Sequence, residues 1–172
     1  MGYTLYDGTI VVLQGILNSL SHILHQAEQR PDGSSLLEAR LHEDMYPFTD
    51  QVRLATQFSE NVAARLTARE PVTFEGKPAT FSQCYERIET VLKVLNEADK
   101  NVVNQNGDML ATTKLGPEKT VEMSGATYAH IVALPNVFFH LTTAYGILRK
   151  EGVPLGKRDY YIGFFPPVAG SQ

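Results

Sequence analysis

The sequence has few of the residues that define several classes of protein. Its 172 residues include one cysteine and no tryptophan, and the formal net charge is only −4. One cysteine cannot form an intramolecular disulfide bond, which fits a reducing compartment. A mildly acidic chain offers no basic surface for the phosphate backbone of nucleic acid. We therefore expect no nucleic-acid partner.

Long unbroken apolar segments are also missing. No run approaches the roughly 20 residues that span a bilayer, and the first residues have neither the basic start nor the cleavage site of a signal peptide. We expect a cytoplasmic protein without a membrane partner. The composition that remains, 43% hydrophobic and 20% charged, is that of a globular protein. The length predicts one domain over residues 1–172.

The common catalytic motifs are absent as well. The chain has no HExxH, no CxxC, no phosphate-binding loop, no dinucleotide fingerprint and no G-x-S-x-G elbow. Cys84 has no evident basic neighbour that would lower the pKa of its thiol, so we expect it to be buried and inert. These absences lead us to predict no cofactor.

Apolar residues recur at helical spacing along three long stretches. The first runs from Gly8 to Arg30, and the second runs from Phe48 to about Arg69. The third begins after Thr80, which forms a capping-box pattern with Gln83. Each stretch is predicted to form an amphipathic helix.

The residues between the third and last predicted helices have a different character. Asn104–Gly107 and Gly116–Lys119 are turn signals. The intervening segments Met109–Leu115 and Thr120–Met123 are short and contain threonine and valine, which favours a β-hairpin. An isolated hairpin is marginally stable, so we expect it to lean on the helices.

The last predicted helix runs from Leu134 to Arg149. Pro135 suits a first helical turn, and Gly152 and Pro154 end the helix. The preceding segment Ala126–Ala133 forms either a separate helical turn or a kinked extension. Four helices of this kind predict an all-α fold, a four-helix bundle with a short β-hairpin insertion before the last helix.

This last helix carries polar residues beside its packing face. The apolar face is formed by Val137, Leu141, Ala144, Tyr145 and Leu148. A neighbouring stripe holds Asn136, His140 and Thr143, and the first two project together at i and i+4. Gln51 interrupts the apolar stripe of the second helix in a similar way. A buried amide costs about 1–3 kcal/mol if it is unpaired, so Gln51 should have a partner or a bound water.

Two segments of the chain resemble a known family. The first runs from Leu134-Pro135-Asn136 through Leu148-Arg149 and on to Gly152–Tyr160. The second is Asp44-Met45-Tyr46-Pro47-Phe48 with Gln51–Ala55. Together they cover about a quarter of the chain and are similar to a family of unknown function, found in fungi and proteobacteria, within the DinB/YfiT-like superfamily.

The resemblance implies a DinB-like four-helix bundle, often dimeric, in which many members hold a metal ion with three histidines. Two of those histidines form an HxxxH motif on the fourth helix, and the third lies on the second helix. In this chain the HxxxH positions fall on Asn136 and His140, and the second-helix position falls on Gln51. Two of the three ligands are thus amides, and we predict no metal.

The favoured hypothesis is a small-molecule-binding bundle, either a binding protein or a cofactor-independent enzyme. His140 would act as a base or hydrogen-bond donor, because an imidazole titrates near neutral pH. Asn136 and Gln51 would orient a carbonyl or hydroxyl group of the ligand. Further lining residues are expected near the mouth of the pocket and beside His140, namely Asp44, Tyr46, Arg53 and Thr143.

Two alternatives belong to other classes of protein. One is a divalent-metal-dependent DinB-like enzyme resembling thiol transferases, in which His42 or His130 substitutes for a missing ligand of His140. The other is a non-catalytic dimeric interaction module, in which the polar residues only fix the helix register.

A homodimer is also expected. The tail Tyr160-Tyr161-Ile162-Gly163-Phe164-Phe165 is too apolar to lie in water, and the DinB-like resemblance implies dimers. The alternative is that the tail packs on its own bundle.

Overall fold

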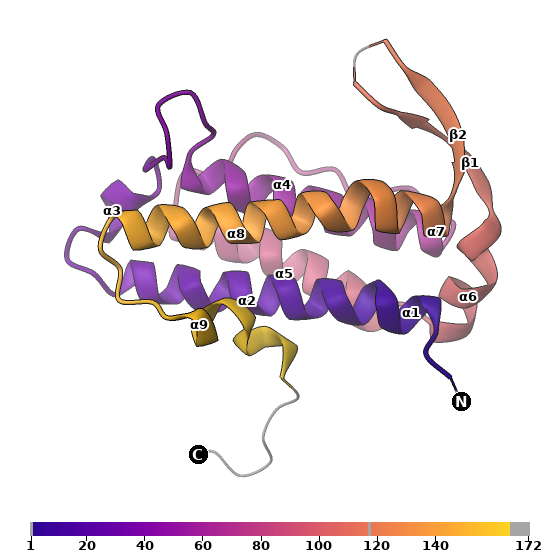
Figure 1. The fold of residues 1–172 in the computed structure, drawn as a ribbon, viewed down its shortest axis with the longest axis horizontal. Coiled ribbons are helices and arrows are strands. Elements are labelled where there is room, and N and C mark those ends of the chain that lie inside the picture. Colours follow the sequence, from indigo (N-terminus) through magenta and orange to yellow (C-terminus); the bar gives the residue numbers. More distant parts are fainter. Residues whose placement is uncertain (1, 117, 166–172) are drawn as a thin grey trace.

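The computed structural model describes residues 2–116 and 118–165. Long helices lie side by side as a bundle (Figure 1). These are α2 (Ile10–Glu28), α4 (Phe48–Leu66), α5 (Phe81–Glu97) and α8 (Leu134–Lys150). The shorter helices among them are α1 (Leu5–Gly8), α3 (Gly33–Leu36), α6 (Lys100–Gln105), α7 (Gly125–Thr127) and α9 (Lys157–Tyr161), with 3-10 turns η1 (Asn106–Asp108) and η3 (Ile162–Phe164). The predicted bundle is confirmed.

The apolar stripes of the long helices meet in one core. α4 contacts both α5 and α8, and α2 packs against the same two helices. The side chains buried at this centre include Leu13, Leu17, Leu20, Phe48, Val62, Leu66, Ile88, Leu95, Val137, Leu141 and Leu148. Gln51 and His140 lie within this interior although both are polar.

The predicted hairpin is present at one end of the bundle. Strands β1 (Leu110–Lys114) and β2 (Thr120–Ser124) pair antiparallel, with Leu110 opposite Ser124 and Lys114 opposite Thr120. The hairpin stands out from the bundle beside α6 and α7 (Figure 1). The turn that joins the strands contains Pro117, which lies outside the described residues.

The segment before α8 is an extension of that helix. Residues Tyr128–Ala133 form a π-helical turn, η2, in which the Leu134 N–H donates to the carbonyl of Ala129. Such wide turns insert one residue into a helix without breaking it. α7, η2 and α8 are therefore continuous over Gly125–Lys150.

This continuous helix is more apolar than the lack of long unbroken apolar runs in the sequence predicted. Among the described residues, Gly125–Lys150 is the one helix long and apolar enough to cross a membrane by length and composition, with a mean hydropathy of 1.5 in its most apolar window. Half of that window is buried inside the bundle. A helix that is apolar on most sides is also what the interior of a bundle requires.

The aromatic tail packs on its own chain. The Gly163 N–H donates to Ser19 Oγ at 3.0 Å, and the ring of Phe164 stacks on Phe138 with centroids 6.3 Å apart. Nε2 of His22 on α2 lies 2.7 Å from Oδ1 of Asp159 on α9. α9 and η3 thus lie along α2 (Figure 1). This is the expected alternative in which the tail packs on its own bundle. Residues 166–172 lie outside the described residues.

Candidate functional site

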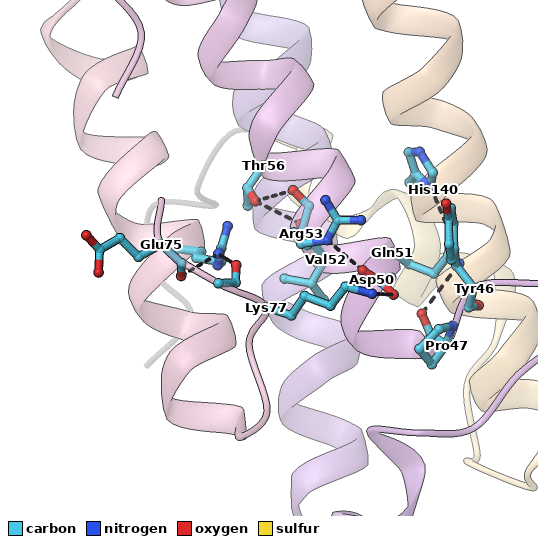
Figure 2. Close-up of polar contacts among 12 residues, drawn as sticks. Tyr46, Pro47, Asp50, Gln51, Val52, Arg53, Thr56, Glu75, Lys77 and His140 are labelled. Carbon is cyan, nitrogen blue, oxygen red and sulfur yellow. Dashed lines mark hydrogen bonds and ion pairs between the residues drawn. The ribbon is translucent and has the colours of Figure 1, made fainter. Parts of the chain in front are cut away.

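The central polar contact of the bundle joins α4 to α8. Nδ1 of His140 lies 2.8 Å from Oε1 of Gln51, and both side chains are buried. Figure 2 shows the two side chains pointing toward one another from facing helices. The sequence singled out both positions because each interrupts or borders an apolar stripe. Their direct contact is a finding of the structure.

The hydrogen bonds of Gln51 determine which ring nitrogen of His140 carries the proton. Nε2 of Gln51 lies 2.9 Å from the carbonyl oxygen of Tyr46 and 3.5 Å from that of Pro47, so this atom is the NH₂ donor. Oε1 therefore faces the imidazole, and Nδ1 of His140 must donate to it. In the neutral ring, Nε2 of His140 then carries a lone pair. Among the described residues, no hydrogen bond to this Nε2 is found.

Burial changes the expected acid–base behaviour of His140. Burial, with a smaller contribution from the positive charge of Arg53, lowers the pKa of the imidazole from 6.5 to about 4, although Asp50 opposes the shift. The ring is therefore neutral at pH 7. The expectation that His140 titrates near neutral pH is thus wrong, because that value applies to an imidazole in water.

Aromatic rings enclose His140, and a small cavity opens beside it. Phe58 stacks on the imidazole with centroids 6.3 Å apart, and the edge of Phe139 meets it at 5.4 Å. The cavity has a volume of about 180 Å³. It is lined by Asp44, Met45, Tyr46, Gln51, Phe139 and His140. Asp44 and Tyr46 are exposed, so they lie at its mouth.

The other predicted site residues lie outside this lining. The Nδ2 of Asn136 donates to the carbonyl of Val132 at 2.6 Å, which uses the amide within its own helix. Arg53 forms an ion pair with Asp50, and Thr143 is buried but does not line the cavity. The structure therefore brings Gln51 and His140 together with Asp44 and Tyr46. It does not bring in Asn136, Arg53 or Thr143.

A charged cluster next to the site was not predicted. Asp50 is 2% exposed and accepts from Arg53 and from Lys77, whose Nζ lies 3.2 Å away. Burial raises the pKa of Asp50, but these two cations outweigh it and hold the pKa below its usual value. Figure 2 shows the cluster beside Gln51. Asp50 lies in the first turn of α4, where a carboxylate is favourable. No sequence signal connects it to Lys77.

Cys84 is buried, as predicted. Burial raises the pKa of its thiol to about 12, and the opposing influence of Arg87 is smaller. Arg87, one helical turn away on α5, is a basic neighbour, so the expectation that Cys84 has none is wrong. The thiol nevertheless stays protonated at neutral pH and is a poor nucleophile.

The donor atoms around His140 do not fit the three-histidine metal centre that the resemblance implies. Gln51 uses its amide nitrogen on two backbone carbonyls and its oxygen on His140. His42 is exposed and bonded to Asp44, and Nδ1 of His130 lies 2.9 Å from the carbonyl of Ala126. His130 lies ten residues before His140, about 15 Å along a helix. No group of three or more histidine, cysteine or acidic side chains gathers within the described residues.

The fold defines the class of the protein. The chain is similar to a crystal structure of a DinB family member protein from Shewanella denitrificans, with a TM-score of 0.81 and 31% identity over 91% of each chain. The structure is thus a DinB-like helical bundle, as the sequence resemblance implied.

The family is shown by the match of residues 5–161 to the model of a domain of unknown function, DUF1993. The chain belongs to this family. No functionally curated protein matches the chain.

Proposed function

We propose that the protein binds a small molecule in the cavity beside His140, through a hydrogen bond donated to Nε2 of the imidazole. The observation that carries this proposal is the contact between Gln51 and Nδ1 of His140, which fixes the tautomer. A neutral imidazole held in this way presents an acceptor with a set direction. The ring of Phe139 supplies an apolar part of the cavity wall, and the ring of Phe58 stacks on the imidazole outside the cavity.

The size of the cavity limits the ligand. A volume of about 180 Å³ is below the roughly 300–1,000 Å³ of typical small-molecule sites. Either the whole ligand is small, or one donor-bearing group of a larger molecule enters while the rest lies across Asp44 and Tyr46. The exposed ring of Tyr46 suits the second arrangement.

We propose binding, and not proton transfer, as the role of His140. A general base is most effective when its pKa lies near the working pH. The pKa of His140 is about 4, so the ring is a weak base at pH 7. The cofactor-independent enzyme is therefore the less favoured form of this hypothesis.

Phenol and anisole test the proposal, because they are similar rings and only phenol has a donor. We expect phenol to bind about three- to tenfold more tightly than anisole, the ratio that one hydrogen bond supplies. Ligand-observed NMR would measure both affinities. The phenol preference should disappear in His140→Ala and remain in the matched variant His130→Ala, whose exposed imidazole lies outside the cavity.

Equal binding of phenol and anisole to the unmodified protein would contradict the proposal. So would a phenol preference that survives His140→Ala. If His140→Ala changed only the free energy of unfolding or the oligomeric state, the pair with Gln51 would serve to fix helix register, and the interaction-module hypothesis would be preferred.

A further inference from the structure

A second and larger cavity lies between α4, the π turn and the hairpin. Its volume is about 570 Å³, within the range of sites for small organic molecules. Phe58, Val132 and Tyr128 form apolar parts of its wall. It shares no lining residue with the His140 cavity, although Phe58 stacks on His140 and so separates the two.

Arg65 is the central cation of this cavity. Nη1 donates to Thr113 Oγ1 at 2.6 Å, and Nη2 donates to the backbone carbonyls of Ala111 and Met123. The guanidinium also lies over the ring of Tyr128, 4.8 Å from its centroid. None of these partners carries a formal negative charge. Among the described residues, no carboxylate forms an ion pair with Arg65.

The guanidinium is also incompletely bonded. Nε of Arg65 is buried and has no hydrogen-bond partner among the described residues. Native proteins leave few buried donors in this state, and each one calls for a physical explanation. The contacts of Arg65 explain how the hairpin is held on α4. They do not explain why a half-buried cation lacks a counter-charge.

The other charged residues around the cavity leave it positive. Arg69 is neutralised by the buried carboxylate of Glu60, at 2.6 Å. Lys114 on β1 lines the cavity, is exposed and makes no ion pair among the described residues. Glu70 is the acidic residue of the lining, and it is also exposed. Arg65 and Lys114 outnumber Glu70 and therefore leave a net positive charge in a partly apolar cavity.

We propose that this cavity binds a small organic anion. Its carboxylate or phosphate group would lie near Arg65 and Lys114, and its apolar body would pack against Phe58 and Tyr128. Arginine and lysine form stronger, charge-assisted hydrogen bonds with such anions than with neutral acceptors. The site is separate from the one proposed for His140 and adds a second ligand class.

Phenylacetate and its neutral counterpart phenylacetamide test this site, with phenyl phosphate as the second anion. Calorimetric titration of the full chain at low salt should show phenylacetate binding about tenfold more tightly than phenylacetamide. Comparison of the two anions shows which acid group is preferred. Amide NMR shifts on titration should be largest for Ala64 and Thr113, which line the cavity.

Two variants on the hairpin form a matched pair of test and control. Lys114→Gln should weaken phenylacetate binding about three- to tenfold, because it removes a charge from the cavity. Lys119→Gln removes the same charge from an exposed position of the same hairpin outside the lining, and should change the affinity less than about twofold.

The proposal is overturned if phenylacetate and phenylacetamide bind equally, or if the two lysine variants weaken binding equally. It is also overturned if the shifted amides belong to Val12 and Phe164, which line a different groove. These measurements use ligands and variants different from the phenol comparison. Either site can therefore fail while the other stands.

Discussion

The side-chain amide of Gln51 connects the chain before α4 to the imidazole on α8. Its nitrogen satisfies the carbonyl of Tyr46, and its oxygen accepts the proton of His140. A single buried residue thus holds two polar groups that would otherwise be unpaired. The consequence is that substitution of Gln51 should cost more than the loss of one hydrogen bond.

We predict that Gln51→Leu lowers the free energy of unfolding by about 1–3 kcal/mol, because it leaves Nδ1 of His140 without an acceptor in the interior. Urea denaturation would measure the change. Gln57→Leu is the matched control, since the side chain of this half-buried glutamine bonds, among the described residues, to Asn61 alone on its own helix. It should change stability by less than about 0.5 kcal/mol. Equal effects of the two variants would contradict the prediction.

The lowered pKa of His140 also makes stability depend on pH. Between about pH 6.5 and pH 4 the unfolded chain binds a proton that the folded chain does not, so stability falls as the pH falls through this window. The difference of about 2.5 in pKa corresponds to a loss of roughly 3 kcal/mol once the pH has fallen through this window. NMR titration should show His140 protonating near pH 4.

Carboxylates also titrate in this window, so the histidine contribution needs a comparison. The free energy of unfolding should fall less between pH 6.5 and pH 4 in His140→Gln than in the unmodified protein. The difference between the two is the contribution of His140. An imidazole signal of His140 that titrates near pH 6.5 in the folded protein would contradict the burial argument.

At the level of the helices, α4 and α8 end in the same way but with different residues. The N–H of Arg69 donates to the carbonyl of Ala64 at 3.0 Å, and that of Val153 donates to Leu148 at 2.9 Å. The residue before each donor has a left-handed conformation, with φ of 53° at Ala68 and 81° at Gly152. Glycine adopts this conformation at little cost, whereas alanine is strained in it.

The two ends therefore predict opposite effects of reciprocal substitutions. Ala68→Gly should raise the free energy of unfolding by about 0.5–1 kcal/mol, and Gly152→Ala should lower it by about 1–2 kcal/mol. Thermal or urea denaturation of both variants would measure this. Changes of the same sign in the two variants would contradict this prediction. They would show that the left-handed backbone conformation does not decide the stability at these two positions.

At the scale of the whole molecule, the outer side of the last helix is unusual. Ile131, Pro135 and Phe139 are exposed at a spacing of four residues. No aspartate, glutamate, lysine or arginine occurs between Glu122 and Arg149. Two copies of this stripe could pair about a twofold axis without bringing like charges together. We propose this face, and not the tail that packs on α2, as the contact of the expected homodimer.

Sedimentation velocity at tens of micromolar would test the dimer. We expect the full chain to be dimeric and Ile131→Glu to be monomeric, because burying a carboxylate at the contact costs several kcal/mol. Leu110→Glu is the matched control on the hairpin, with 67% exposure against 70% for Ile131, and should stay dimeric. A chain truncated after Asp159 should also stay dimeric.

A monomeric full-length protein at this concentration would exclude the homodimer. A dimer that is lost on truncation after Asp159 would assign the contact to the tail. The same truncation should lower stability in either case, because it removes the packing of Phe164 on Phe138.

The sequence by itself determined the helices and the hairpin, and it singled out the buried polar residues Gln51 and His140. Helical and strand periodicity, and signals such as Thr80 and Gly152, depend on neighbours within a few residues, so they can be read locally. Gln51 and His140 stood out for the same reason, since each is a polar residue in or beside an apolar stripe.

Only the tertiary structure decided which polar groups meet. Asn136 shares the stripe of His140, yet its amide turns back to Val132, while Gln51 reaches His140 from 89 residues away. The contact of Asp50 with Lys77, the packing of the tail on α2 and the lowered pKa of His140 were equally outside local reasoning. Each depends on the rotation of helices about their axes, on side-chain rotamers and on the water that packing excludes.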